Sequence, residues 1–185
     1  MSHRHSIFCI LPPYMLTEIV ENGSDAQSEF AAQTLALSQP IRERRQSHTP
    51  AARRGYTGGQ PQAAAAAVKQ RAVYSANSGT SLPGTLVRSE GSAPVADVAV
   101  NEAYDGSGAT FDLFDEIYGR NSIDNNGLKL TSTVHYGVGY DNAFWDGKQM
   151  VYGDGDENLP EAQRLFNRFT ISLDVIGHEL THVVS

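Results

Sequence analysis

The sequence predicts an α+β fold in which a small helical unit precedes a larger lobe that contains a sheet and ends in a helix. Two helix-patterned segments lie within residues 6–40, and residues 41–70 then combine arginines and glycines with little apolar content. From residue 71 onwards, short β-branched and aromatic runs are separated by turn signals, which is typical of strands joined by short connections. We therefore expect a curved, mainly antiparallel sheet that follows a separate helical unit.

The composition is that of a globular protein, and it excludes several functional classes. The chain has 185 residues and a net charge of −7, with 40% apolar and 19% charged residues. The acidic balance argues against nucleic-acid binding, and a single cysteine, Cys9, excludes an internal disulfide and a cysteine-rich zinc module. No apolar run approaches the roughly 18 residues of a membrane helix. Ile7–Leu11 is too short for the core of a signal peptide, so none is visible.

The charge divides unevenly between the two parts of the chain. Residues 1–70 carry 7 basic and 5 acidic side chains, whereas residues 71–185 carry 7 basic and 16 acidic ones. Complementary net charges favour association between surfaces. We therefore expect two modules that attract each other.

The first module should contain two short helices. Pro13 suits the first turn of a helix, because the amide hydrogen that proline lacks would have no helical partner there. Gly23 follows as a stop signal, and Ser24 with Gln27 forms a candidate capping box for a second helix. Pro40 is expected to end that helix. Two short helices cannot bury much apolar surface alone, so they should pack on something larger.

The second module should alternate strands with helices. Runs with apolar residues at helical spacing indicate helices, and alternating or β-branched runs indicate strands. The Asp146-Gly147 pair lies between two such runs, as in a β-hairpin. The expected elements are a strand at 73–74, helices at 94–104 and 110–118, strands at 128–136, 143–145 and 149–152, an acidic loop at 153–160 and a strand at 166–171.

The last segment should be a helix that begins after Ser172. Ser172 can cap its amino terminus, and Asp174 lies in the first turn, where the helix dipole favours an anion. Ile176 and Leu180 form its apolar face. The chain stops at Ser185 without a capping glycine, so we expect the helix and the protein to continue beyond it.

This helix carries a His-Glu-x-x-His motif at residues 178–182. Histidines four residues apart lie on one helix face, where both imidazoles can bind one zinc ion at ~2.0–2.1 Å. Glu179 can accept a proton from a zinc-bound water, whose pKa the metal lowers to about 7. The alternative is that His178 and His182 fall four apart on a surface helix by accident, since the motif is short.

Longer strings before this motif resemble the thermolysin-like metallopeptidases, the M4 family. Asn-Ala-Phe-Trp at 142–145 and Tyr-Gly-Asp-Gly-Asp at 152–156 are more specific than the zinc motif itself. Together with Val-His-Tyr at 134–136 and Asp-Val-Ile-Gly at 174–177, they follow the family's order across residues 71–185. The resemblance implies a zinc endopeptidase that acts on protein or peptide substrates. It also implies secretion, while the lack of a visible signal peptide leaves a cytoplasmic enzyme as the alternative.

The resemblance further implies roles for individual residues. His178 and His182 would be zinc ligands, and Glu179 would be the general base. An edge strand beside them would hydrogen-bond the substrate backbone and line or support the cleft. The residues implied for this substrate-binding role are Asn142, Ala143, Phe144 and Trp145. Ordinary core packing is the alternative for the two aromatic side chains.

The segment Pro12-Pro13-Tyr14, with the two helices behind it, resembles the short propeptide of the protealysin subgroup. In that subgroup the Pro-Pro segment occupies the substrate cleft, so the resemblance implies a zymogen with an intramolecular inhibitor. Tyr14 and Leu16 are expected to supply apolar contact beside the metal. Cys9 is either a latency thiolate that binds the zinc or a small buried hydrophobic residue. The implied division is a propeptide at 1–45, a linker with the processing site at 46–70, and the N-terminal lobe of the catalytic domain at 71–185.

Other features of the family fall outside this sequence. The third zinc ligand, a glutamate, and the downstream catalytic histidine would both follow Ser185. The alternative function is therefore a catalytically inactive module whose propeptide-like unit binds and inhibits a protease. Calcium binding stays open, because Asp174 matches a calcium position of long-propeptide relatives, whereas the short-propeptide group resembles a calcium-free form. Asp141 stands where relatives often have asparagine.

Overall fold

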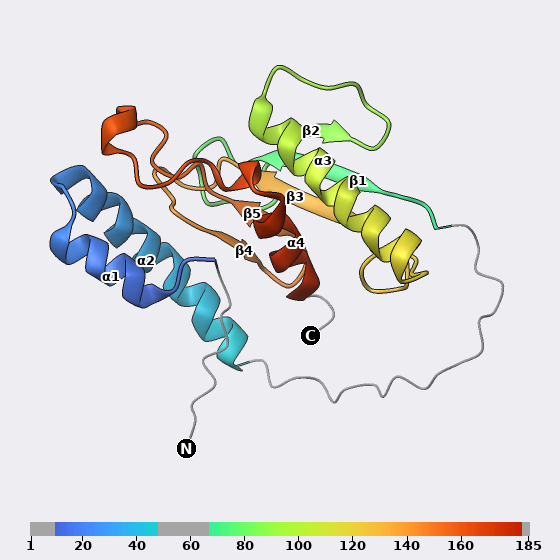
Figure 1. Cartoon of the computed structure of the whole chain (residues 1–185), viewed down its shortest axis with the longest axis horizontal. Helices are drawn as coiled ribbons and strands as arrows, with labels where there is room; N and C mark the ends of the chain where they lie inside the picture. The colour runs from blue at the N-terminus through green and yellow to red at the C-terminus, as the bar shows by residue number, and fades with distance from the viewer. Residues whose placement is uncertain (1–9, 48–66, 183–185) are drawn as a thin grey trace.

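The computed structural model describes residues 10–47 and 67–182, and the backbone alone for 44–47. Figure 1 shows a pair of N-terminal helices lying beside a larger lobe. Within residues 67–182 the lobe holds one five-stranded sheet and two further α-helices. The predicted α+β class is therefore confirmed. No helix in the described ranges is both long and apolar enough to cross a membrane.

The N-terminal unit consists of α1 (Pro13–Asn22) and α2 (Asp25–Ser47), which pack against each other. The predicted turn between them is confirmed in detail. The N–H of Gly23 donates a hydrogen bond into the last turn of α1 at 2.8 Å. Ser24 and Gln27 exchange the two hydrogen bonds of a capping box, at 2.9 and 3.4 Å. Local sequence signals therefore set the length of α1 and the start of α2.

The second helix does not end at Pro40, as the sequence predicted, but continues to Ser47. Proline removes one amide donor and leaves the other hydrogen bonds of the helix available. The arginine, glutamate and glutamine residues that follow are good helix formers. Leu37 and Ile41, on either side of the proline, also pack on buried aromatic residues of the lobe. Propensity and packing together outweigh the lost hydrogen bond.

The sheet has the strand order β2-β1-β3-β5-β4, so β4 lies at one edge. Its strands are β1 (Arg71–Ser75), β2 (Thr85–Ser89), β3 (Leu130–Val134), β4 (Ala143–Trp145) and β5 (Met150–Tyr152). The predicted hairpin is confirmed, because β4 and β5 pair antiparallel, as do β1 and β2. However, β3 runs parallel to both β1 and β5. The sheet is thus mixed rather than mainly antiparallel, because long crossovers and not hairpins separate these parallel neighbours.

A single helix replaces the two that were expected at 94–104 and 110–118. This helix is α3 (Val98–Asp112), and it continues into a π-helical turn, η1 (Leu113–Ile117). The side chain of Asp97 caps its amino terminus at 3.3 Å. The capping residue, and not the preceding proline, therefore decides where α3 begins.

The final helix, α4 (Leu173–Thr181), forms as predicted and is capped by the Ser172 hydroxyl at 3.4 Å. It packs against α3 at a glycine. A Cβ atom added at Gly106 would lie only 2.3 Å from Cδ1 of Ile176. Gly106 therefore permits a close approach of the two helices.

The segment between β5 and α4 contains no strand among its described residues, although one was expected at 166–171. Instead it forms two short 3-10 turns, η2 (Glu161–Gln163) and η3 (Phe169–Ile171). The N–H of Phe169 donates to the carbonyl of Gly153 at 3.1 Å. This segment is thus held to the loop after β5 and does not add a strand to the sheet.

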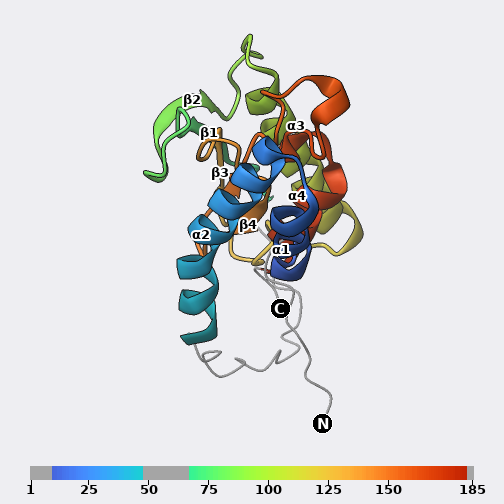
Figure 2. The same cartoon turned by 90° about the vertical axis from the view of Figure 1, so that its left-hand side faces the viewer.

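Two buried clusters hold the parts of the molecule together. The larger lies between the sheet and the helices α3 and α4, and Leu11 and Leu16 from the N-terminal unit belong to it. The smaller contains Tyr136, Tyr140 and Phe144, with side chains of α2 packed against it. Figure 2 draws β4 between α2 and α4. The edge of the sheet therefore lies where the helical unit and the lobe meet.

Candidate active site

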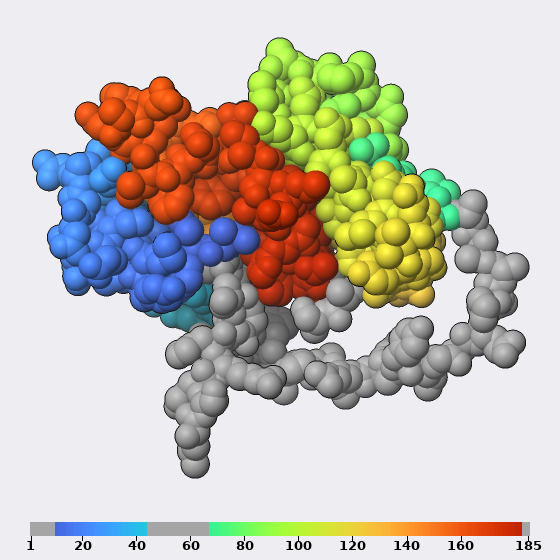
Figure 3. All heavy atoms as spheres, viewed as in Figure 1, coloured from blue at the N-terminus to red at the C-terminus, as the bar shows by residue number. Residues whose placement is uncertain are grey.

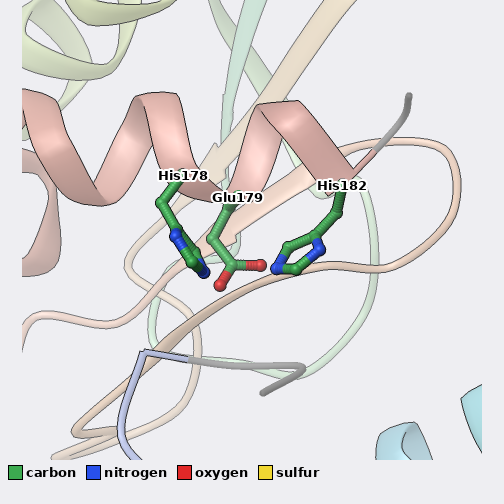
Figure 4. A group of neighbouring side chains, drawn as sticks. All are labelled: His178, Glu179 and His182. Carbon is green, nitrogen blue, oxygen red and sulfur yellow. The ribbon is translucent and has the colours of Figure 1, made fainter. Parts of the chain in front are cut away.

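The three polar side chains of the His-Glu-x-x-His motif converge beside α4 (Figure 4). The rings of His178 and His182 meet edge to face, with centroids 4.9 Å apart and planes at 87°. One donor atom from each histidine and a carboxylate oxygen of Glu179 all lie within 4.8 Å of one another. His178 is exposed, His182 is half-buried and Glu179 is fully buried. A single helical turn thus concentrates two imidazoles and one carboxylate.

This set of donor atoms fits a zinc ion. Zinc prefers imidazole nitrogen, thiolate sulfur and carboxylate oxygen in compact, roughly tetrahedral sites. Across residues 10–47 and 67–182, no other group of three histidine, cysteine or acidic side chains is arranged to hold a metal. The residues that the sequence singled out are therefore brought together, and their binding of zinc stays a prediction.

The edge strand β4 holds the carboxylate of Glu179 from the other side. The backbone N–H of Trp145 donates a hydrogen bond to its Oε2 atom at 3.0 Å. A hydrogen bond from an amide to a buried carboxylate is stronger than one between neutral groups. The position of Glu179 is therefore determined jointly by the helix and by the edge of the sheet.

Successive residues of β4 face opposite sides of the sheet, as in any strand. Ala143 and Trp145 lie in the larger cluster, on the side of α4. Phe144 instead packs against Tyr136 and Tyr140, with ring centroids 5.6 and 6.0 Å away. Of the two aromatic residues expected at the cleft, Trp145 is on the side of the motif, whereas Phe144 supports the strand from behind.

Asn142, the residue before β4, binds the N-terminal segment through both ends of its side-chain amide. Its Oδ1 accepts a hydrogen bond from the N–H of Leu11 at 3.1 Å, and its Nδ2 donates to the carbonyl of Leu11 at 3.2 Å. Both residues are buried. Figure 4 draws a short blue piece of the N-terminal chain below and to the left of His178. The pair of bonds involves only backbone atoms of Leu11 and therefore does not depend on its side chain.

Comparison with known protein families matches most of the chain to one family. Residues 52–185 match the family described as thermolysin metallopeptidase, catalytic domain. The chain belongs to the thermolysin metallopeptidase family. The matched region contains every strand of the sheet, both helices of the lobe and the His-Glu-x-x-His motif.

Two members of the family resemble the chain over nearly all of its length. An extracellular metalloprotease of Pectobacterium carotovorum subsp. carotovorum is 44% identical over 180 residues, which are 97% of this chain and 47% of that protein. The solved precursor of protealysin, a metalloproteinase from Serratia proteamaculans, is 44% identical with a TM-score of 0.74. That alignment covers 95% of this chain and 46% of the other. The chain thus spans about half the length of these relatives.

The N-terminal helices indicate the branch of the family. A bacillolysin of Brevibacillus brevis is 46% identical over 112 residues, but these are only 60% of this chain. The alignment with the protealysin precursor leaves out only about one residue in twenty, so it extends through the N-terminal helices. The chain is therefore a thermolysin-like M4 protein of the protealysin type.

The N-terminal residues that were expected to lie in the cleft differ in their burial. Pro13 is the first residue of α1, and Tyr14 is 72% exposed. The apolar contact expected from Tyr14 is therefore absent among the described residues, because the helix directs this side chain to solvent. Leu16, by contrast, is fully buried in the larger cluster, and Leu11 lies in the same cluster and bonds to Asn142 through its backbone. Cys9 lies outside the described residues.

A second contact between the helical unit and the lobe was missed from sequence. We call it the α2 seam, formed by α2 and residues 137–142. The Thr34 hydroxyl accepts a hydrogen bond from the N–H of Asp141 at 2.9 Å and donates to a backbone carbonyl of the same loop at 3.4 Å. The hydroxyls of Ser38 and Tyr140 lie 2.9 Å apart. The spacing of small polar residues along α2 was the one available signal.

The two N-terminal helices also touch the segment that leads to α4. Gln27, at the start of α2, donates to the carbonyl of Gln163 at 2.7 Å. Figure 3 shows the blue helical unit seated against this orange segment of the lobe. The helical unit thus contacts the lobe at Asn142, at the α2 seam and beside η2.

Two charged clusters that sequence reasoning missed support the site from a distance. His135 follows β3, and its ring nitrogens lie 2.9 Å from Asp154 and 2.8 Å from Asp97, the cap of α3. The hydrogen bond with Asp154, with a further contribution from Asp97, raises the pKa of His135 to about 9. The imidazole is therefore charged at neutral pH. This cluster ties the ends of β3 and β5 to α3.

The second of these clusters anchors the approach to α4. The guanidinium of Arg168 donates to Glu102 on α3 at 2.8 and 2.7 Å, and to Glu157 at 2.8 Å. The hydroxyl of Thr170 also donates to Glu102, at 2.7 Å. Asp174 lies in the first turn of α4, as predicted, where the helix dipole favours an anion.

Proposed function

We propose that this chain belongs to a zinc-dependent endopeptidase that is made as a latent precursor. The observation that carries the proposal is the close packing of His178, Glu179 and His182, whose donor atoms lie within 4.8 Å of one another beside the edge strand β4. Membership of a metallopeptidase family supports peptidase activity. The identity of the metal, the role of Glu179 as the base and the latency of the precursor are proposed in addition.

In this proposal His178 and His182 hold the zinc ion. Zinc, when bound, lowers the pKa of its water to about 7 and polarises the peptide carbonyl. Glu179 accepts a proton from the attacking water at its carboxylate. The N–H of Trp145 already orients that carboxylate, so little reorganisation accompanies the proton transfer.

The backbone of the substrate is proposed to bind at Asn142 and along β4. The side-chain amide of Asn142 now holds the N–H and the carbonyl of Leu11. A residue of an extended substrate offers the same two groups once Leu11 has left. Ala143 and Trp145 then continue the edge on which the peptide lies, with Phe144 supporting the strand.

The N-terminal unit is proposed to be an intramolecular inhibitor. Leu11 occupies the amide of Asn142, and the α2 seam holds the unit in place. Pro12 and Pro13 lack amide hydrogens and restrict the backbone, so the segment is a poor substrate. Because α2 continues to Ser47, we place the processing site after that residue. Secretion is proposed because one relative is named an extracellular metalloprotease.

The variant Glu179→Gln tests the proposed chemistry in the natural gene product. It should retain zinc, measured by elemental analysis, and lose several orders of magnitude in the rate of peptide hydrolysis, because it removes the base and leaves both histidines. The variant His178→Ala should lose the zinc as well. The alternative, an inhibitory module without catalysis, is the right account if the wild-type product binds a protease but hydrolyses nothing. A Glu179→Gln protein that kept most of its activity would falsify the role of the base.

A further inference from the structure

A buried acid lies in the middle of the α2 seam. Three of its neighbours along the loop bond to the helical unit: the carbonyl of Gly139, the hydroxyl of Tyr140 and the side chain of Asn142. The backbone N–H of Asp141 does the same, because it donates to Thr34 on α2. Every residue from 139 to 142 thus contacts the unit that the lobe must release.

The carboxyl group of Asp141 differs from its neighbours. The residue is 2% exposed, and its Oδ1 atom is buried without a hydrogen-bond partner among the described residues. A buried carboxylate that lacks hydrogen bonds is costly when ionised, whereas the neutral acid is tolerated. Burial, with a smaller contribution from the carboxylate of Asp156, raises the pKa of Asp141 to about 7.

Among the described residues, one other charged group, Asp156, acts on the carboxyl of Asp141. Asp156 lies in the loop after β5, where it accepts hydrogen bonds from the backbone of Leu165 and Phe166 at 2.8 and 2.7 Å. From α2, the group in contact with Asp141 is the neutral hydroxyl of Thr34. Among the described residues, no cation compensates a negative charge on Asp141. Its ionisation therefore places two like charges beside the seam.

We propose that Asp141 makes the docking of the N-terminal helical unit dependent on pH, because its neutral form fits the closed seam and its ionised form favours release. The inference rests on the proposed inhibitory role of this unit and adds a trigger to it. The chemistry is a proton equilibrium alone, in which the carboxyl loses its proton to solvent. Release at neutral to alkaline pH would expose the α2 seam and free Asn142 from Leu11.

The sign of the effect follows from linkage. The pKa of an exposed aspartate is about 3.9, whereas the pKa of the docked one is about 7. The docked state therefore binds more protons than the released state across this interval. Docking is strongest at pH values below the lower pKa. It weakens by up to about tenfold for each pH unit between the two pKa values and is constant above the upper one.

The test measures docking in the full chain by hydrogen exchange between pH 5 and pH 8, with intrinsic exchange rates removed. In the wild type, the protection of α2 relative to β3 should fall at least tenfold over this range. The isosteric variant Asp141→Asn should change less than threefold. The matched control Asp105→Asn, at a side chain that is 73% exposed, should follow the wild type. Equal pH dependence in wild type and Asp141→Asn overturns the proposal, as does a wild type without pH dependence.

A second measurement needs no variant. The carboxyl carbon of Asp141, followed by NMR in the wild-type chain, should titrate near pH 7, the pH at which the loss of α2 protection levels off. A midpoint near pH 4 overturns the proposal even if the variant fails to fold. Both readouts report docking and neither requires zinc or peptide hydrolysis. A failure here is therefore distinguishable from a failure of the proposed peptidase function.

Discussion

At the candidate site, Trp145 acts through its backbone, whereas Asn142 acts through its side chain. Trp145 contributes its backbone N–H to Glu179, while its indole packs in the core. Asn142 contributes its side chain, which binds the backbone of Leu11. A substitution at Trp145 therefore changes packing and leaves the hydrogen bond possible, whereas any substitution at Asn142 removes a contact to the peptide.

Another single residue, His135, should make the stability of the folded protein decrease at alkaline pH. Its pKa is raised from 6.5 in the unfolded chain to about 9 in the folded one, so the folded state holds the proton more tightly. The resulting stability is fully present below pH 6.5 and is lost as pH rises through about 9. His135→Asn suits the backbone φ of 56° and removes the charge. Urea unfolding should show the largest deficit of this variant at pH 6 and almost none at pH 10; a constant deficit would contradict the argument.

Among the elements, α4 is positioned by contacts at its amino terminus and along the face that packs on α3. Gly106 admits Ile176 against α3, and Ser172 caps the first turn. Arg168 holds the preceding segment to Glu102 on α3. The motif therefore sits on a helix whose start and closest packing are both determined. Such placement is what a site needs if its donor atoms are to stay within reach of one ion.

Two glycines test this packing. Gly106→Ala should lower the free energy of unfolding by about 1 kcal/mol or more, because overpacking of about 1–3 kcal/mol exceeds the gain in helix propensity. Gly177→Ala is the matched control on α4, where the nearest atom to an added Cβ is 4.0 Å away. That variant should be stabilised by about 0.5–1 kcal/mol. Urea unfolding measures both, and a stabilising Gly106→Ala would show that the helices have room to separate.

For the whole molecule, docking of the helical unit uses apolar and neutral polar contacts. Leu11 and Leu16 enter the larger cluster, and hydroxyl groups of α2 bond to the loop before β4. Among the described residues no ion pair joins the helical unit to the lobe, although the two modules differ in net charge. Opposite charge can steer the approach, but the observed contacts decide the final position.

The proposed inhibition by the N-terminal unit should therefore depend on Leu11 more than on Tyr14. In a peptide of residues 1–47 added to the mature natural enzyme, Leu11→Ala should weaken inhibition at least tenfold, about 1.4 kcal/mol. The reason is that the side chain of Leu11 is buried. Tyr14→Ala is the control and should have little effect, since this side chain is 72% exposed. Inhibition constants measure both; equal losses would mean that the peptide docks in another way.

The sequence by itself determined the features that depend on neighbouring residues. The turn at Gly23, the capping box of Ser24 and Gln27, and the cap of Ser172 all formed as predicted, because each involves atoms within four positions of one another. The convergence of His178 with His182 has the same origin, and the hairpin of β4 and β5 depends on the short turn between its strands. The thermolysin-like strings identified the family for a different reason, because they are sequence motifs of that family and do not depend only on local structural preference.

Only the tertiary structure decided the features that join distant parts of the chain. The parallel pairing of β3, the extension of α2 past Pro40, and the choice of Leu11 over Tyr14 depend on partners far away in sequence. Leu11 and Asn142, for example, are 131 positions apart. Contacts of this kind form only when the whole fold brings the two segments together, and the energy of packing them exceeds the local preferences that a sequence pattern reports.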